Sequence, residues 1–254
     1  MPGGKPEGAE FDVVFRPIQT EQNKLMEFYR CVPVYRMPDD TFADAPQALR
    51  KGERAEDFWV KNEIVVKEGM DGLKVAVKQG LNTKLLVPVH AEVAAKKATA
   101  RELLALFKTY DERLRKRVMV DVVGLEADVS MDMMEDVTIP LMAVTDKMVA
   151  QAPRGMDDFK IFSNLNYLGM SLDLLDKDWG GEELGELLDS FALNSRHWRL
   201  RPFVTGVKTP DILNAVRDIG PYAIDGMGLN PGSKQVPMEW PQFEQIQSEM
   251  TFGE

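Results

Sequence analysis

The chain has 254 residues, of which 44% are hydrophobic and 28% are charged, and its formal net charge is −10. This composition is typical of a globular protein with a sizeable core, and the negative charge argues against a DNA-binding surface. The single cysteine, Cys31, excludes an internal disulfide, and no apolar run approaches the roughly 20 residues of a membrane-spanning helix. We therefore expect a cytoplasmic protein that does not insert into a membrane.

The first ten residues, Met1–Glu10, contain several glycines and prolines and predict a flexible leader. Apolar, β-branched segments beyond it predict strands. These segments are Phe11–Ile18, Phe28–Tyr35, Lys84–His90, Arg117–Val123, Phe159–Leu165, Ser171–Leu175, Arg201–Val207 and Tyr222–Met227. The first two strands are separated only by the polar segment Gln19–Lys24, which predicts a short turn and antiparallel pairing.

Helical periodicity predicts helices between most of these strands. The expected helices are Ala55–Lys78, Thr99–Arg117, Met131–Gln151 and Glu182–Trp198. In the second of them, Thr99 and Glu102 have the spacing of a capping box, which would satisfy two backbone donors at the helix start.

The segment from Arg201 to Asp211 contains the most informative local pattern. Thr209 is suited to cap a helix, and Pro210 has the fixed φ that the first helical position favours. Gly220 is expected to end that helix. Lys208 therefore lies where the carboxyl end of a strand turns into a helix, which is where α/β proteins place their sites.

Strands that alternate with helices predict an α/β fold with a parallel sheet, closed as a barrel and containing one antiparallel strand. An open, doubly wound sheet is the competing topology. No glycine-rich phosphate loop follows the first strand, so a dinucleotide-binding fold has little support.

The residues that could carry chemistry have simpler structural interpretations. His90 ends an apolar strand, His197 lies on a predicted helix, and Cys31 lies in a buried strand pattern, where an unreactive packing thiol is expected. The acidic residues at strand ends could bind a divalent metal only if several converge. They are Asp121, Asp173, Asp176 and Asp225, and solvated or capping carboxylates explain most of them.

The order of several motifs resembles that of the EAL-domain family of cyclic-di-GMP phosphodiesterases, across most of Phe11–Gly232. The motifs are Phe15-Arg-Pro-Ile18, the segment Asn23–Cys31 before the family's Glu-Ala-Leu position, Leu86–His90, Val118–Gly124, and Thr205-Gly-Val-Lys-Thr209 with Ile224-Asp-Gly226. The resemblance implies a modified TIM-like (β/α)8 barrel of the EAL type over 11–232, with 233–254 as a C-terminal extension.

The family's metal ligands and catalytic residues are almost absent at the matching positions. The signature glutamate falls at Tyr29, the metal-binding asparagine at Pro88, and the glutamate of Gly-Val-Glu-Thr at Lys208. The remaining matches are Asp121 and Gly124 for Glu-Ile-Thr-Glu, Asp225 for the later glutamine, and Leu174-Leu-Asp176 for Lys-Ile-Asp. We find no counterpart of Asp-Asp-Phe-Gly. The resemblance therefore implies neither catalytic residues nor bound Mg²⁺ or Mn²⁺.

Three hypotheses follow. The first is a non-catalytic EAL-like module that regulates through protein contacts, with a protein partner or as a homodimer. The second is a metal-independent receptor for cyclic-di-GMP, with Arg30, Arg36 or Lys208 contacting phosphates. The third is an enzyme with different chemistry that uses His90, Asp121 and Asp225. The candidate ligand-binding residues are Arg30, Asp121, Lys208 and Asp225.

Overall fold

The computed structural model describes residues 7–20, 28–45, 55–175 and 177–236. Its strands are β1 (Glu10–Pro17), β2 (Gln19–Thr20), β3 (Phe28–Arg36), β4 (Phe42–Asp44), β5 (Lys84–His90), β6 (Val118–Val123), β7 (Met148–Gln151), β8 (Gly169–Asp173), β9 (Arg201–Thr205) and β10 (Ala223–Ile224). Its helices are α1 (Ala55–Lys78), α2 (Ala91–Ala95), α3 (Lys97–Lys108), α4 (Glu112–Arg115), α5 (Met131–Met142), α6 (Lys160–Asn164), α7 (Gly181–His197) and α8 (Pro210–Asp218).

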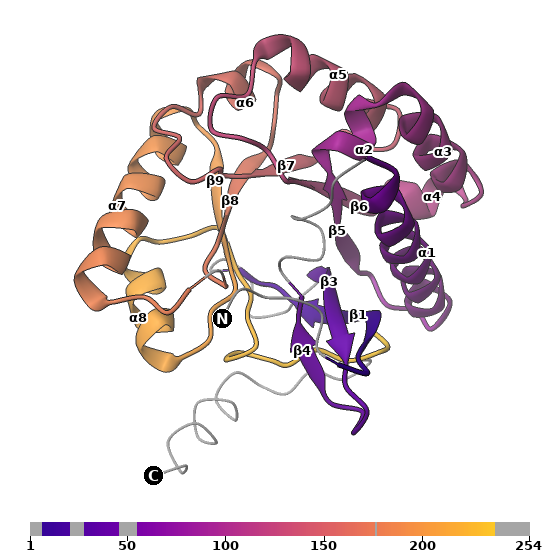
Figure 1. Ribbon diagram of the computed structural model, residues 1–254, viewed down its shortest axis with the longest axis horizontal. Coiled ribbons are helices and arrows are strands. Elements are labelled where there is room, and N and C mark those ends of the chain that lie inside the picture. Colours follow the sequence, from indigo (N-terminus) through magenta and orange to yellow (C-terminus); the bar gives the residue numbers. More distant parts are fainter. Residues whose placement is uncertain (1–6, 21–27, 46–54, 176, 237–254) are drawn as a thin grey trace.

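The strands form one sheet in the order β1-β3-β5-β6-β7-β8-β9-β10-β2, with β4 paired to β3 beside this path. Strand β1 is antiparallel to β3, β2 is antiparallel to β10, and the pairs from β3 to β10 along this order are parallel. Only Ile18 separates β1 from β2, so both ends of the sheet lie on one stretch of chain. The sheet therefore nearly closes into a barrel, with helices around its outside (Figure 1).

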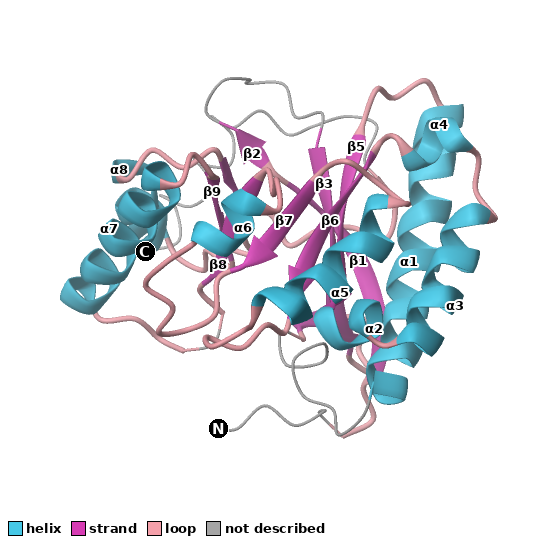
Figure 2. Cartoon of the chain, turned by 90° about the horizontal axis from the view of Figure 1, so that it is seen from above, coloured by secondary structure: helices cyan, strands magenta, loops and turns pink. Residues whose placement is uncertain are grey.

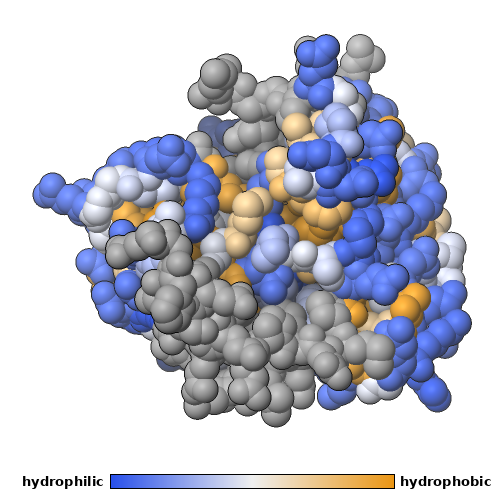
Figure 3. Space-filling model, turned by 90° about the horizontal axis from the view of Figure 1, so that it is seen from below, coloured by the Kyte–Doolittle hydropathy of each residue, from blue (hydrophilic) through white to orange (hydrophobic). Residues whose placement is uncertain are grey.

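This architecture confirms the predicted α/β barrel; its antiparallel pairs involve β1 and β2, which form one stretch of chain, and also β4, which was not predicted. Helices α1 and α3 cover one side of the strands and α7 and α8 cover the other (Figure 2). The predicted turn Gln19–Lys24 is wrong at its start, because Gln19–Thr20 is strand β2; residues 21–24 lie outside the described residues. On the face in Figure 3, the described surface is mainly hydrophilic, with hydrophobic residues visible between the polar ones.

The predicted strand Phe159–Leu165 is wrong, because this segment contains the short helix α6. Phe159 and Phe162 are three residues apart, and both rings pack edge to face with other aromatic rings, which a helical turn allows. The strand next to β6 is β7, so the predicted helix Met131–Gln151 is wrong at its carboxyl end. The helix ends at Met142, two residues after Pro140.

The predicted helix Thr99–Arg117 is two helices, α3 and α4, separated at Thr109–Asp111. The expected capping box is also wrong, because α3 begins at Lys97 and its N-cap is Lys96. The Thr99 hydroxyl donates to the carbonyl oxygen of Val93 at 2.8 Å, so it links α3 back to α2. Helix α8 confirms the prediction: the Thr209 hydroxyl accepts from the Ile212 amide at 3.3 Å, and Gly220 has a φ of 56°.

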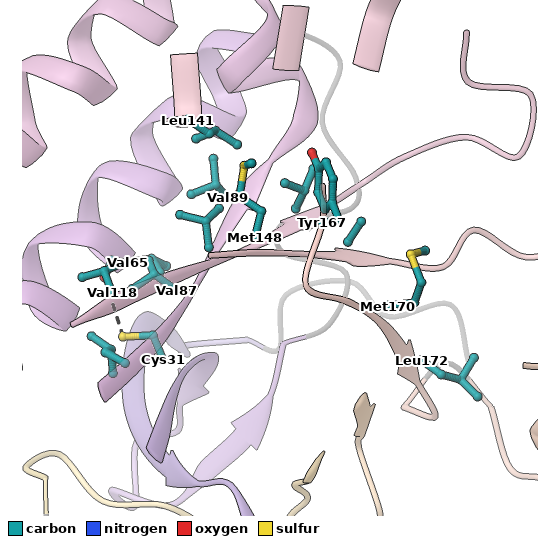
Figure 4. Packing of buried hydrophobic residues seen from close by; sticks show 14 of the residues in the cluster. Cys31, Val65, Val87, Val89, Val118, Leu141, Met148, Tyr167, Met170 and Leu172 are labelled. Atoms are coloured by element: carbon teal, nitrogen blue, oxygen red, sulfur yellow. Dashed lines mark hydrogen bonds between the residues drawn. The ribbon is translucent and has the colours of Figure 1, made fainter. Parts of the chain in front are cut away.

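Alternation along the strands divides the core into two parts. Side chains that face outward pack against the helices, and Figure 4 shows part of this layer, in which the Cys31 thiol points to the Val65 carbonyl. Side chains that face inward near the start of the parallel strands form a second apolar cluster. Its buried members are Ile18, Leu86, Met119, Val149, Phe203 and Ala223. One step further toward the carboxyl ends, the inward positions on β3, β6 and β8 are polar, namely Arg30, Asp121 and Ser171.

An amide from α1 completes the sheet where β3 and β5 separate. Strand β5 pairs with β3 only up to Leu86, and Pro88 has no backbone N–H. The fully buried Asn62 side chain donates to the Pro88 carbonyl at 3.1 Å and accepts from the His90 amide at 2.9 Å. Asn62 thus takes over bonds that a neighbouring strand would supply, and it fixes the carboxyl end of β5.

The chain after β10 returns to the barrel wall. Phe15 and Ser233 exchange two backbone hydrogen bonds, of 2.7 and 3.0 Å, and Val236 is buried in the main core. Residues 1–6 of the predicted leader and 237–254 of the predicted extension lie outside the described residues, and the domain boundaries stay predictions. Among the described helices, none is long and apolar enough to cross a membrane.

Candidate functional site

A buried cation occupies the inside of the barrel near the carboxyl ends of its strands. The Arg30 guanidinium bridges two carboxylates, with Nη2 3.4 Å from Asp121 Oδ2 and Nη1 3.5 Å from Asp225 Oδ2. The exposed fractions of the three side chains are 7%, 0% and 1%. Three of the four predicted ligand-binding residues therefore meet, and they meet as an ion-paired cluster.

The electrostatics of this cluster follow from its removal from water. Burial raises the pKa of Asp121 to about 6, although the charge of Arg30 and the hydroxyl of Ser171 both act to lower it. Burial likewise raises the pKa of Asp225. For Arg30, burial favours the neutral form, but the surrounding carboxylates outweigh it and raise the pKa above its ordinary value. The guanidinium is therefore permanently charged, and the carboxylates depend on it for compensation.

Neighbouring strands supply further hydrogen bonds to the two carboxylates. The Ser171 hydroxyl on β8 donates to Asp121 Oδ1 at 2.9 Å, and the Gly206 amide after β9 donates to Asp225 Oδ1 at 3.4 Å. Each carboxylate thus has the guanidinium and at least one further donor, which reduces the cost of burying its charge.

A second buried guanidinium stands beside the first. Arg16 on β1 is 1% exposed, and its Nη2 lies 2.7 Å from Asp44 Oδ1 on β4. This pair attaches the β4 strand to the barrel wall. The sequence analysis did not identify Arg16 as a candidate. Side chains alternate between the two faces of a strand, so Arg16 shares a face with Val14 and Ile18, and this pattern could have placed it inside the barrel.

Asp173 lies at the end of β8 and binds the segments around it. The Leu175 amide donates to Asp173 Oδ1 at 2.8 Å, and the Gln151 amide group on β7 donates to Oδ2 at 3.4 Å. The Arg154 guanidinium donates to the Asp173 backbone carbonyl at 3.0 Å. Asp173 therefore holds the β8 loop in place and is largely occupied by these bonds.

The strand register shows which way the side chains face at two of the expected matches to the EAL motifs. Tyr29 is in the outward-facing core, while Arg30 faces the barrel interior, so the inward residue near the signature position is a cation. Strand β8 ends at Asp173, with Ser171 and Asp173 facing inward at a spacing of two. We infer that Ser171-Leu-Asp173 matches Lys-Ile-Asp better than Leu174-Leu-Asp176; Asp176 lies outside the described residues.

The side chains at this position do not suit the family's metal ions. Mg²⁺ and Mn²⁺ need several oxygen ligands around one point. Among the described residues, no three His, Cys, Asp or Glu side chains form such a group. Asp121 and Asp225 instead share a guanidinium, and the inward-facing neighbour on β5 is Pro88, which has no side-chain oxygen.

Lys208 lies apart from the cluster, at the mouth of the barrel. Its ammonium is 3.6 Å from Asp178 Oδ1 and 3.5 Å from the Lys177 carbonyl, and its side chain is partly exposed. It lines a pocket of about 400 Å³, which we term the mouth pocket. The other described residues of this pocket are Asp44, Leu175, Met227 and Gly228.

The remaining candidates have structural roles. His90 is stacked on Phe58 with ring centroids 3.6 Å apart, and its Nδ1 accepts from the Glu92 amide at the start of α2. Burial lowers the pKa of His90 to about 4, so its ring is neutral at pH 7. Burial also raises the pKa of the Cys31 thiol, which keeps it protonated. His197 is exposed, and Arg36 forms an exposed pair with Glu10 at 2.6 Å.

No family model matches the sequence, and no curated protein matches it. Solved structures of EAL domains do match its fold. LapD S helix-GGDEF-EAL from Vibrio cholerae has a TM-score of 0.64 at 12% identity, over 85% of this chain and 52% of that one. The YkuI protein of Bacillus subtilis, with an EAL domain and in complex with substrate c-di-GMP and calcium, has a TM-score of 0.69 at 13% identity, over 95% and 59%.

A standalone versatile EAL protein from Vibrio cholerae O395, in its c-di-GMP bound form, has a TM-score of 0.63 at 14% identity, over 94% of this chain and 99% of that one. The chain thus spans about half the length of the LapD chain and nearly all of the standalone protein. Likeness at this identity establishes the fold.

Proposed function

We propose that this chain, which has the fold of an EAL domain, is a non-catalytic signalling or regulatory module that acts through protein contacts. The observation that carries the proposal is the buried bridge from Arg30 to Asp121 and Asp225. The barrel framework is retained, while the two carboxylates Asp121 and Asp225 inside it share the positive charge of one guanidinium, which belongs to the protein itself.

Two-metal hydrolysis needs oxygen ligands that hold two cations close together against their mutual repulsion. A guanidinium between Asp121 and Asp225 adds a third positive charge at the same place. At an effective dielectric of about 20, two like unit charges 4 Å apart repel by about 4 kcal/mol. A metal would therefore have to displace Arg30 from its two partners, at the cost of leaving that charge buried without compensation.

The direct test is cyclic-di-GMP turnover by the full chain with Mg²⁺ or Mn²⁺, followed by separation of the nucleotides. We expect no product above the protein-free reaction. Turnover that disappears in Asp121→Ala, but persists in the matched variant Asp189→Ala on the exposed face of α7, would overturn the proposal. A thermal melt of each variant confirms that it is folded.

Protein contacts are supported by apolar side chains on the outside of α5. Ile139 and Met142 lie about one helical turn apart, and they are 65% and 63% exposed. A contact with another protein or a second copy on this face would remove these two side chains from water. A homodimer and a cytoplasmic location are part of this proposal.

A metal-independent receptor for cyclic-di-GMP is the second candidate, and the mouth pocket favours it. Lys208 there offers a cation to a phosphate, and EAL domains of similar fold are described in complexes with c-di-GMP. Asp44 in the same pocket is already paired with Arg16, and Lys208 is paired with Asp178, so the pocket offers little positive charge to an anion and the receptor ranks second. Calorimetry with cyclic-di-GMP should show a saturable heat of binding. Lys208→Ala should weaken this binding, and Lys97→Ala, at an exposed position away from the pocket, should not. The absence of heat at high micromolar nucleotide would exclude the receptor hypothesis.

An enzyme with different chemistry has less support. The His90 ring is held by Phe58 and by the Glu92 amide. Asp121 and Asp225 share Arg30, and the contacts of the described residues link neither carboxylate to His90. Such a site would need these groups to face one substrate.

A further inference from the structure

The end of the barrel opposite the mouth carries a concentration of positive charge. We term this end the floor and define it as the segments that lead into β5, β6, β7 and β9, namely 80–84, 109–117, 143–147 and 198–201. These segments contain eight Lys and Arg against three Asp and Glu, a net charge of +5 in a chain of net charge −10. The loop after β6, at the other end, has three acidic residues and no basic one over 124–132.

Backbone hydrogen bonds join the floor segments into one surface. The Leu85 amide donates to the Arg117 carbonyl at 2.9 Å, and the Val120 amide donates to the Lys147 carbonyl at 3.1 Å. Further around the sheet, the Leu168 backbone amide donates to the Met148 carbonyl at 2.7 Å, and the Arg201 backbone amide donates to the Leu168 carbonyl at 3.1 Å. Helix α4, which contributes Arg113 and Arg115, lies at this end of the strands (Figure 2).

Several floor cations lack an acidic partner. Lys84, Arg199 and Arg201 are exposed, and in the described part of the chain none of them forms an ion pair. Lys116 and Lys147 do pair, but with acidic residues of their own segments, Glu112 at 2.8 Å and Asp146 at 3.9 Å. Elsewhere, Arg36 and Lys67 have carboxylate partners, whereas Lys97 and Arg101 on α3 are exposed and have no ion pair within the described residues. The floor therefore holds positive charge that the fold itself leaves available.

Two aromatic rings, Trp198 in the floor and Tyr222 beside it, are already in contact with side chains of this protein. The Arg201 guanidinium lies 4.5 Å from the centre of the Tyr222 ring, which also packs edge to face with Phe203 at a centroid distance of 5.2 Å. Lys160 and His197 lie against the Trp198 ring at 5.9 and 4.8 Å. Nucleic acids bind such surfaces by stacking bases on free ring faces and by a continuous basic track. Covered rings and interspersed acidic residues favour a short anionic segment instead.

We propose that the floor is a docking surface for an acidic segment of a partner protein. This inference rests on the proposed function, because it names the contact through which the module acts. Guanidinium groups bind carboxylates through paired, charge-assisted hydrogen bonds, and the net positive surface attracts an acidic segment from a distance. The mouth pocket, at the other end, stays open while the floor is occupied.

The test uses the full chain and a fluorescent peptide of alternating glutamate and serine, with a glutamine and serine peptide as the neutral probe. Fluorescence anisotropy at about 50 mM salt should detect binding of the glutamate peptide alone, and about 300 mM salt should abolish it. Arg199→Glu/Arg201→Glu and, independently, Lys84→Glu/Arg113→Glu should weaken binding by about tenfold or more. The control variant Lys97→Glu/Arg101→Glu on α3 makes the same change of charge away from the floor, and it should weaken peptide binding less.

Equal losses in the floor and α3 variants, or no binding of the glutamate peptide, would overturn the docking proposal. Tighter binding of a single-stranded DNA or of anionic lipid vesicles than of the peptide would also overturn it. Melting curves establish that each variant is folded. The assay does not depend on catalysis: cyclic-di-GMP turnover would overturn the proposed function whatever the peptide does, whereas absent peptide binding without turnover overturns only the docking proposal.

Discussion

Arg30 Nη2 lies 3.4 Å from Asp121 Oδ2 inside the barrel, and both side chains are almost entirely removed from solvent. Asp225 accepts the other terminal nitrogen of the same guanidinium. A buried pair of this kind contributes little net stability compared with an apolar replacement, but breaking it leaves a charge without its partner. Loss of either partner is therefore expected to destabilise the fold.

Replacing Arg30 with alanine should destabilise the protein strongly. The change leaves Asp121 and Asp225 buried without their cation, and loss of one partner from a buried pair costs about 3–5 kcal/mol. The matched variant is Arg36→Ala, which removes an arginine from the same strand where its pair with Glu10 is exposed, and it should change little. Chemical denaturation of both variants measures the difference; similar stabilities would show that Arg30 is not a structural cation.

The stability of the protein should depend on pH through Asp121. Burial raises the pKa of this carboxyl to about 6, above its value of about 3.9 in an unfolded chain. The stabilisation that the protonated Asp121 carboxyl contributes to the free energy of unfolding is therefore fully present below about pH 4, and it is lost as the pH rises through 6. Asp121→Asn lacks this titration. The difference between its melting temperature and that of the wild type should therefore change in favour of the variant as the pH increases from about 4.5 to 7.

The control for this titration is Asp189→Asn, an exposed carboxylate on α7. Its melting temperature should follow that of the wild type across the same range. If the Asp121→Asn and wild-type curves also run parallel, the buried carboxyl does not titrate as described.

Asn62→Ala should lower the free energy of unfolding by about 2–3 kcal/mol. The substitution removes the side chain that joins the Pro88 carbonyl and the His90 amide, and it leaves a buried acceptor and a buried donor without their bonds. Asn194→Ala on α7, where the side chain donates to the exposed Ser190 carbonyl, is the matched control and should cost much less. Equal losses in urea denaturation would refute the role assigned to Asn62.

Gly124→Ala should destabilise the protein more than Gly155→Ala. Both glycines have a φ near +80°, so each substitution has the backbone cost of about 1–2 kcal/mol for a left-handed residue. A Cβ at Gly124 would also collide with the His90 ring, whereas a Cβ at Gly155 would meet no atom of the described residues within 4 Å. Crowding in a packed interior should add about 1–3 kcal/mol to the loss in free energy of unfolding caused by Gly124→Ala. Comparable melting temperatures would show that the ring can move aside.

The barrel was predictable because its signals are local. Strand and cap patterns, such as Lys84–His90 and Thr209-Pro210, specify their elements through alternation and capping. Strand β7 was missed because four buried residues after a helix carry no distinct period. The site was only partly predictable: Asp121 and Asp225 stood at strand ends, but their bridge through Arg30 depends on register, which places a residue on one face or the other.

The most direct test of the central claim is calorimetric titration of Mn²⁺ into the wild-type chain and into Asp121→Asn near neutral pH. If Arg30 compensates Asp121 and Asp225, the two proteins should give the same small, non-saturating heats. Stoichiometric Mn²⁺ binding by the wild type that Asp121→Asn abolishes would contradict the account, because the carboxylate would then serve a metal and not the guanidinium.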